Sequence, residues 1–289
     1  HNVTIKGLNP GMRSNIDVNG INDLLGPGGG SKLVARNAEA AIKVETGMKG
    51  VKIMNLMVSG GTEARNIGIH FVGATDNGML SNIIGINLHT GVKIEQAKNM
   101  QIVNCWVCEL PNSIELIGGE NIVVKNCQLG AQPTGITCKV QEVNKLSFIN
   151  NQVYPDGREN LVLDACNNCV IEGNNFKSYY NGILVLNGND NTVNKNIFWL
   201  TGAVQNQLLD HGDDFGIINV KGNNNMVASN SLSCEWAYAG AVTVNAVQGT
   251  GNVFKNCFVD NLESYRVFLV NAQTEVSNCV SSDKVSIVE

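Results

Sequence analysis

Short runs in which apolar residues recur at every second position fill most of the chain from Val51 onward. Examples are VKIMNLMV at 51–58, IVVKNCQL at 122–129 and TVNKNIF at 192–198. This alternation is typical of β-strands with one buried face, whereas the spacing of an amphipathic helix is not sustained anywhere. The pattern predicts an all-β chain built from short strands.

The strands belong to a repeat that asparagines mark. From Asn104 to Asn196 they follow one another at steps of 22, 24, 24 and 22 residues. The full series is Asn55, Asn82, Asn104, Asn126, Asn150, Asn174, Asn196, Asn230, Asn256 and Asn278. Such a period indicates a solenoid, and short strands joined by tight bends predict a single-stranded right-handed parallel β-helix with coils of roughly 22–25 residues. Equivalent side chains then form columns, in which stacked asparagines can pass hydrogen bonds from coil to coil.

We expect one domain over residues 1–289. Residues 1–50 form the N-terminal coils with a glycine-rich loop, and residues 51–285 form regular coils. The step of 34 residues between Asn196 and Asn230 places a loop insertion near 201–214. The chain starts with a strand and turn typical of the inside of a coil, so we expect the N-terminal part of the native protein to be missing from this sequence.

Aligning the runs predicts which side chains face outward on one wall of the solenoid. The inward column is Ile69, Val92, Ile114, Ile136, Leu161, Ile183 and Ile217. The outward column is His70, Lys93, Glu115, Thr137, Val162, Leu184 and Ile218. Three apolar residues at the end of an outward column require a cover. The alignment therefore predicts a homotrimer with three parallel axes.

Charge and composition limit the classes of binding partner. The net charge is −5 without a basic run, which argues against nucleic acid, whereas a neutral polysaccharide fits. No window approaches the roughly 18 apolar residues of a membrane-spanning helix, so no membrane is expected. No compartment is indicated.

Nine cysteines include two CxxC pairs, Cys105/Cys108 and Cys166/Cys169. Positions i and i+3 of a strand point to opposite faces, so we interpret these thiols as structural rather than as a metal or redox site.

Five segments, taken in order, resemble the inulin fructotransferases and difructose-anhydride III hydrolases of glycoside hydrolase family 91. They are NSIELIGG (112–119), YPDGREN (154–160), DACNNCVIEGN (164–174), YYNGILVLNG (179–188) and DHGDDFGIINVKGNNN (210–225). The resemblance implies a right-handed β-helix that assembles as a trimer and acts on a fructan or on a difructose dianhydride without a cofactor or a metal. The implied chemistry uses two carboxyl groups, one donating a proton to the leaving oxygen and one accepting a proton from the attacking hydroxyl.

Glu115 matches the catalytic glutamate of that family. The family's second carboxylate, an aspartate eleven residues earlier, is replaced here by Asn104, and an amide cannot exchange a proton at neutral pH. Three explanations for Asn104 are open: an inactivating substitution, a natural change of chemistry, or replacement of the aspartate by another acid. The candidates for that other acid are Glu109, Asp156 and Asp213. Lys93 can pair with Glu115 and would favour its role as a base.

Asn104 and Glu115 lie half a coil apart, so a site between neighbouring subunits would bring the two positions together. Other substrate-binding candidates are Arg158, Tyr179, Tyr180, Asp210, His211 and Asp214. The acidic residues of the 201–214 insertion also fit a plain solvated loop.

Two other functions stay open. One is another β-helix polysaccharide lyase or hydrolase, although no cluster of aspartates for calcium lies on the regular coils. The other is a non-enzymatic binding or structural β-helix such as a phage tailspike, which Asn104 keeps in view.

Overall fold

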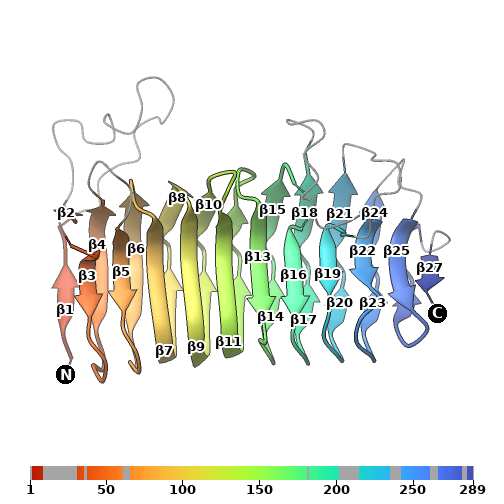
Figure 1. Cartoon of the computed structure of the whole chain (residues 1–289), viewed down its shortest axis with the longest axis horizontal. Helices are drawn as coiled ribbons and strands as arrows, with labels where there is room; N and C mark the ends of the chain where they lie inside the picture. Colours follow the sequence, from red (N-terminus) through yellow and green to blue (C-terminus); the bar gives the residue numbers. More distant parts are fainter. Residues whose placement is uncertain are drawn as a thin grey trace.

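The computed structural model describes residues 2–8, 31–35, 38–60, 66–180, 182–201, 215–234, 242–260, 266–281 and 285–288. These residues form parallel β-strands wound into one elongated solenoid (Figure 1). Each strand pairs with its equivalent in the next coil, so three walls run along the axis. The predicted all-β parallel β-helix is confirmed.

The first wall faces the viewer in Figure 1. Its strands are β3 (Ala40–Val44), β5 (Ile67–Phe71), β7 (Thr90–Val103), β9 (Asn112–Lys125), β11 (Ile136–Ile149), β13 (Glu159–Asp164), β16 (Leu184–Asn187), β19 (Ile218–Val220), β22 (Val242–Ala246), β25 (Arg266–Asn271) and β27 (Val285–Val288).

The second wall is the last in each coil and precedes the first wall of the next coil. Its strands are β2 (Lys32–Val34), β4 (Lys52–Ser59), β6 (Met79–Ile86), β8 (Trp106–Leu110), β10 (Gln128–Ala131), β12 (Gln152–Val153), β15 (Asn175–Ser178), β18 (Ile197–Leu200), β21 (Ser231–Cys234) and β24 (Phe258–Asp260).

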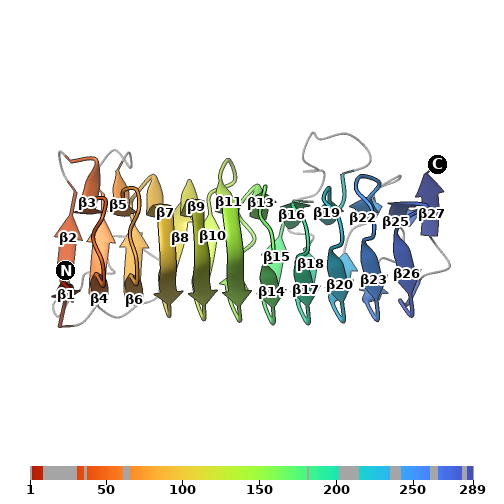
Figure 2. The same ribbon diagram turned by 90° about the horizontal axis from the view of Figure 1, so that it is seen from below.

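The third wall links the other two. Its separate strands are β1 (Thr4–Lys6), β14 (Val170–Glu172), β17 (Thr192–Asn194), β20 (Met226–Ala228), β23 (Val253–Lys255) and β26 (Glu275–Ser277). The long strands β7, β9 and β11 continue from the first wall into it, and the starts of β4 and β6 also belong to it. Strands β14, β17, β20 and β23 lie side by side in both views (Figure 2).

One hydrophobic core fills the space between the walls, from Ile42 to Cys279. The core forms because apolar residues occupy every second position of the strands. In β15, for example, Phe176 is fully buried while Asn175 and Lys177 face outward. Because the strands are in register, Phe176 lies over Phe198 of the next coil with ring centroids 5.0 Å apart. The period of two in the sequence therefore becomes a continuous stack of core side chains.

The asparagine series is two columns rather than the single column expected from the sequence. Asn55, Asn82, Asn104, Asn126 and Asn150 occupy a bend with positive φ, which asparagine adopts more readily than most residues. In later coils the same bend holds Gly173, Lys195, Ser229, Asn256 and Asn278. Asn174, Asn196 and Asn230 instead lie one position later, in a buried column with Asn151 and four cysteines.

The buried column satisfies backbone groups inside the core. Asn174 accepts the N–H of Asn151 at 2.8 Å, and its own amide donates to the carbonyl of Phe148 at 2.8 Å. Cys127 fills the equivalent position and accepts the N–H of Cys105 at 3.5 Å. The cysteines that follow bend asparagines are therefore core groups, as expected.

The second CxxC pair departs from the expectation that positions i and i+3 point to opposite faces. Cys166 and Cys169 flank a bend, and both point into the core rather than to opposite faces. The eight cysteines whose side chains are described are free thiols, so the structural interpretation holds for them.

The outward column of the first wall differs from the expected one beyond Glu115. The register aligns His70, Lys93, Glu115, Lys139, Val162, Val185 and Asn219. The expected Thr137, Leu184 and Ile218 were wrong, and Leu184 and Ile218 are fully buried core residues. The corners between walls vary in length, so a fixed step misplaces the strand that follows each corner.

Candidate functional site

A small pocket opens on the outer side of the second wall where β8, β10 and β12 lie side by side. Its volume is about 70 Å³. Its lining residues are Trp106, Cys108, Glu109, Gly130, Ala131, Tyr154 and Asp156. Gly130 keeps it open, because a Cβ there would lie 3.0 Å from the Cβ of Tyr154 and 3.6 Å from the Sγ of Cys108. Two of the three acids considered as substitutes for the missing aspartate thus meet in one pocket.

A β-bulge aims Glu109. Val107 pairs with Leu129 and Leu110 pairs with Ala131, so two residues of β8 face the single Gly130 of β10. Glu109 takes the left-handed conformation, with a φ of 64°, and its side chain is exposed. Bulges of this kind re-aim a side chain and are frequent beside active sites. The bulge therefore places the side chain of Glu109 among the residues that line the pocket.

Asp156 lies in the turn that follows β12. Partial burial removes hydration from its carboxylate and raises the pKa of Asp156 above its usual value. Burial and, to a smaller extent, the negative charge of Asp156 raise the pKa of Tyr179, so the two side chains share one environment. The backbone joins them further, because the N–H of Tyr179 donates to the carbonyl of Pro155 at 3.2 Å. A carboxyl group with a raised pKa suits the donation of a proton.

Aromatic side chains form the apolar part of the pocket. Trp106 is buried in a small outer cluster with Met57, Ile84, Ile86 and Cys108, and Tyr154 packs against this cluster. The hydroxyl of Tyr154 donates to Oε1 of Gln128 at 3.0 Å. Sequence reasoning named neither Tyr154 nor Gly130 as a site residue, although Tyr154 opens the YPDGREN segment.

Glu115 lies on a different wall. It faces outward from β9, where the hydroxyl of Thr90 donates to its Oε1 at 3.3 Å, and Nδ1 of His89 lies 3.1 Å from the same hydroxyl. Lys93 and Lys139 are its neighbours in the column. Lys93 forms its ion pair with Oε1 of Glu95 at 2.9 Å rather than with Glu115, so the pairing expected from the sequence was wrong.

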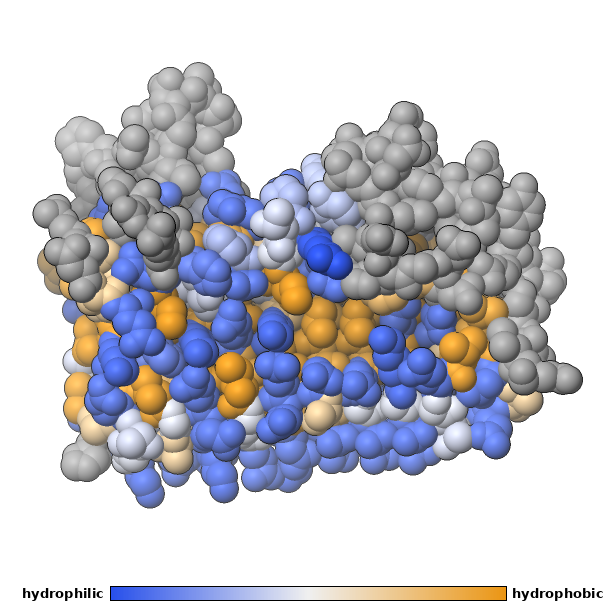
Figure 3. Space-filling view, viewed as in Figure 1, coloured by the Kyte–Doolittle hydropathy of each residue, from blue (hydrophilic) through white to orange (hydrophobic). Residues whose placement is uncertain are grey.

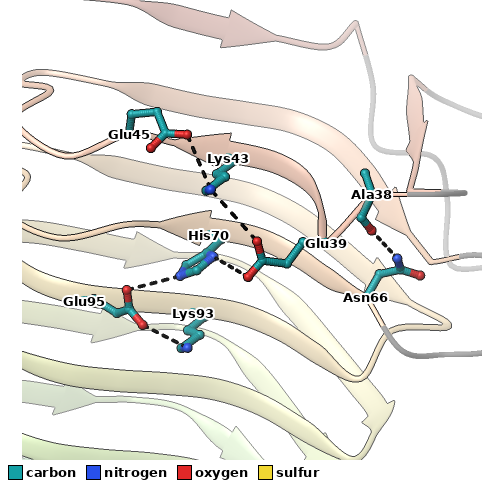
Figure 4. A network of polar contacts seen from close by, with 8 residues as sticks. All are labelled: Ala38, Glu39, Lys43, Glu45, Asn66, His70, Lys93 and Glu95. Atoms are coloured by element: carbon teal, nitrogen blue, oxygen red, sulfur yellow. Dashed lines mark hydrogen bonds and ion pairs between the residues drawn. The ribbon is translucent and has the colours of Figure 1, made fainter.

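A network of charged side chains continues that column toward the N-terminal end (Figure 4). Buried His70 lies between two carboxylates, with Nε2 3.4 Å from Glu95 and Nδ1 3.8 Å from Glu39. Lys43 lies 3.9 Å from Glu39 and 3.5 Å from Glu45. The hydrogen bond and the negative charge of Glu95 raise the pKa of Lys93, and Glu115 adds to this effect. Glu115 therefore belongs to a polar strip on the first wall that runs on to Lys139.

Asn104 does not join Glu115 within one chain. It occupies the bend between β7 and β8 with a φ of 57°, and its N–H donates to the carbonyl of Lys125 at 3.1 Å. The whole of β8 and the next corner separate it from Glu115. Asn104 thus has the same bend role as Asn82 and Asn126.

The remaining candidates scatter around the pocket or beyond it. The N–H of Arg158 donates to the carbonyl of Gly135 at 2.8 Å, which fixes the turn after Asp156. The N–H of Tyr180 donates to Oγ of Ser178. Asp210, His211, Asp213 and Asp214 lie outside the described residues, as does most of the 201–214 insertion.

The described part of the chain contains no group of three His, Cys, Asp or Glu residues placed to hold a metal ion. Among the same residues, no helix has the length and apolar character needed to cross a membrane.

Solved structures share the fold. DFA-IIIase from Arthrobacter chlorophenolicus A6, without its lid and in complex with GF2, superposes with a TM-score of 0.82 at 21% identity, covering 99% of this chain and 80% of that chain. The same enzyme in complex with DFA-III gives a TM-score of 0.74 at 21% identity, covering 90% and 74%. ORF18 of Geobacillus virus E2 gives 0.58 at 13% identity, covering 86% and 56%.

No curated protein matches the sequence. A family model described as the right handed beta helix region matches residues 134–287, more than half of the chain. This match agrees with the parallel walls and the continuous core. The chain therefore belongs to the right-handed β-helix family.

Proposed function

We propose that this protein is a carbohydrate-active enzyme that breaks and remakes fructosyl bonds. Its substrate would be inulin, from which it would form a difructose dianhydride, or that dianhydride, which it would hydrolyse. The observation that carries the proposal is the meeting of Glu109 and Asp156 beside Trp106 and Tyr154 in one pocket. Glycosidic bond cleavage requires two carboxyl groups. The pocket would supply the acid, Asp156 or Glu109, and Glu115 of a neighbouring subunit would supply the base. The fold shared with DFA-IIIase directs the choice of fructans.

The roles follow from protonation. Asp156, with its raised pKa, would donate a proton to the leaving oxygen as the bond to the anomeric carbon breaks. Glu115 would act as the base, accepting the proton of the hydroxyl that attacks that carbon, and Thr90 would orient it. In transfer the hydroxyl belongs to the neighbouring fructose, and in hydrolysis it belongs to water. Glu109 is the alternative acid, and Asn104 holds its bend without exchanging a proton.

A subunit interface would bring these groups together. Within one chain, Glu115 faces outward from the first wall and Asp156 borders the second. The pocket of about 70 Å³ holds no more than a few waters, whereas sugar-sized ligands need several hundred Å³. In a ring with threefold symmetry the first wall of one subunit faces a different wall of the next. We infer a homotrimer in which Glu115 of one subunit closes the pocket of another.

The apolar surfaces fit this arrangement. Figure 3 shows an apolar stretch over the strands β13, β16 and β19 of the first wall. Half-buried Val162 and Val185 stand in its outward column. On the second wall, Ile197 is 49% exposed and Phe258 is 51% exposed. Apolar patches on two different walls are what a heterologous contact buries.

The test is incubation with inulin and, separately, with difructose anhydride III, followed by chromatography of the products. We expect one of the two substrates to be converted, and the conversion to be lost in Glu115→Gln. If neither substrate changes, Asn104→Asp is assayed next, since Asp also tolerates positive φ. Turnover in that variant would indicate that this protein is a fructan enzyme that Asn104 has inactivated. No conversion by either protein would contradict the proposal.

A further inference from the structure

Two residues at the start of β7 form a chain of hydrogen bonds that ends on Glu115. The hydroxyl of Thr90 lies 3.3 Å from Oε1 of Glu115, and Nδ1 of His89 lies 3.1 Å from that hydroxyl. Thr90 is buried, His89 is exposed and Glu115 is half-buried. A single buried hydroxyl therefore connects an exposed imidazole to the carboxylate.

Backbone contacts to the coils on both sides fix the corner that carries this chain. The N–H groups of His89 and Thr90 both donate to the carbonyl of Asn66, at 2.8 and 3.4 Å. On the other side, the N–H of Asn112 donates to the carbonyl of His89 at 3.0 Å, and Asn112 is the register partner of Thr90. Because β9 starts at Asn112 and carries Glu115, the register sets the ring and the hydroxyl relative to the carboxylate.

The single proton of the Thr90 hydroxyl fixes the direction of the chain. An ionised carboxylate only accepts hydrogen bonds, so this proton is donated to Oε1 of Glu115. Nδ1 of His89 must then donate to Oγ of Thr90, which requires the imidazole to carry a proton on Nδ1. A ring in this form holds the hydroxyl turned toward Glu115.

We propose that His89 is a positioning residue, whose Nδ1–H directs the Thr90 hydroxyl onto Oε1 of Glu115 and so makes Oε2 the oxygen that takes the proton. This rests on the proposed role of Glu115 as the base. The O–H bond of the attacking hydroxyl breaks as the bond from its proton to Oε2 forms, and the electron pair left on that oxygen forms the new bond to the anomeric carbon. A carboxylate held through one oxygen presents the other in a fixed direction, and small losses of alignment lower the rate.

Kinetics on the converted fructan substrate test this role. His89→Ala should lower kcat about fivefold, the effect of one lost neutral hydrogen bond, with KM unchanged within about twofold. His89→Asn should restore the rate, because the asparagine amide supplies a donor in place of Nδ1. Thr90→Val should lower kcat about 10- to 100-fold, the effect of a lost hydrogen bond to a charged group. Thr90→Ser keeps the hydroxyl and should keep the rate.

Gln101→Ala is the matched control, because Gln101 is an exposed residue in the part of the same strand that belongs to the third wall. It should change neither kcat nor KM. The Tm of His89→Ala should equal that of the unchanged protein, since the ring is exposed. A loss in His89→Ala that falls on KM alone, that His89→Asn shares in full, or that accompanies a lower Tm would overturn the proposal.

A measurement that needs no turnover separates this inference from the proposed function. Long-range nitrogen–proton NMR spectra report the tautomer of each histidine ring, and the signal that is missing in His89→Asn belongs to His89. At about pH 9, where imidazoles are neutral, His89 should carry its proton on Nδ1, and in Thr90→Val the proton should move to Nε2. A proton on Nε2 in the unchanged protein would overturn the inference, even if fructan is converted. The Nδ1 form in a protein that converts no fructan would support the hydrogen-bonded chain and refute only the proposed function.

Discussion

At the scale of single residues, backbone conformation gives the acids of this surface their different chemistry. Glu109 is turned outward by a bulge opposite Gly130, and Asp156 is held in a turn that strips part of its hydration. Glu115 lies on a regular strand, with a hydroxyl partner in the preceding coil. Asp156 combines a place in the pocket with a raised pKa.

Asp156→Asn is expected to lower turnover by about 100-fold or more, the usual contribution of a positioned general acid. The wild-type rate should fall as pH rises through the raised pKa of Asp156, because the acid form is needed, and the variant should lose that limb of the profile. Rates measured from low to neutral pH check this.

Stability separates that effect from misfolding. The pKa of Asp156 is raised on folding, so charging it above its unfolded pKa destabilises the native state, and stability falls with rising pH in that range. The Tm of Asp156→Asn near neutral pH should therefore equal or exceed that of the wild type. Asp190→Asn, at an exposed bend with a φ of 58°, should change neither rate nor Tm. A lower Tm with a matching loss of rate would refute the catalytic role.

At the scale of elements, the buried asparagine column stabilises the bends between the third and second walls. Each amide satisfies a backbone N–H of the preceding coil and a carbonyl of the same region. These groups lie inside the core, where an unpaired polar group is costly. Cysteines fill the same position in other coils, where the thiol of Cys127 accepts the N–H of Cys105.

Asn174→Ala leaves the N–H of Asn151 and the carbonyl of Phe148 without these partners. At about 1–3 kcal/mol for each unsatisfied buried group, we expect a loss of about 2–4 kcal/mol in the free energy of unfolding. Denaturant titration followed by circular dichroism measures it.

Asn187→Ala is the control for that experiment, because it removes only an exposed contact with Asp164 at 2.7 Å. Its cost should stay within about 0.5 kcal/mol. Asn174→Cys should recover part of the loss, since a thiol accepts a backbone N–H at the equivalent position 127. Equal stability of the alanine and cysteine variants would contradict this account of the column.

At the scale of the whole molecule, the proposed activity depends on surfaces that one chain cannot close. Glu115 and Asp156 lie on two different walls, and the pocket over β8, β10 and β12 is small. The half-buried valines of the first wall and the exposed Ile197 and Phe258 of the second would be the contact surfaces of the proposed trimer.

Val162→Glu combined with Val185→Glu should yield monomers in analytical ultracentrifugation and abolish turnover, because charges at an apolar contact are poorly solvated there. Circular dichroism should still report a folded β-sheet protein, since both side chains face away from the core. Lys125→Glu, a charge reversal on the exposed third wall, should leave both assembly and activity intact. A fully active monomer would sink the shared-site proposal.

The alternation of apolar residues and the asparagine repeat by themselves determined the parallel β-helix, its coil length and the outward placement of His70, Lys93 and Glu115. These features depend on local periodicity, which the chain states directly. Asn104, a bend residue in the sequence pattern, is also a bend residue in the structure.

Only the tertiary structure decided which residues share a column after a corner, and hence that Leu184 and Ile218 are core while Lys139 and Val185 face outward. Corner lengths vary between coils, and a change of one residue reverses the face of every residue that follows. The pocket could not be predicted from the sequence either. Glu109, Gly130 and Asp156 come from three coils, and a bulge that no local pattern marks brings them together.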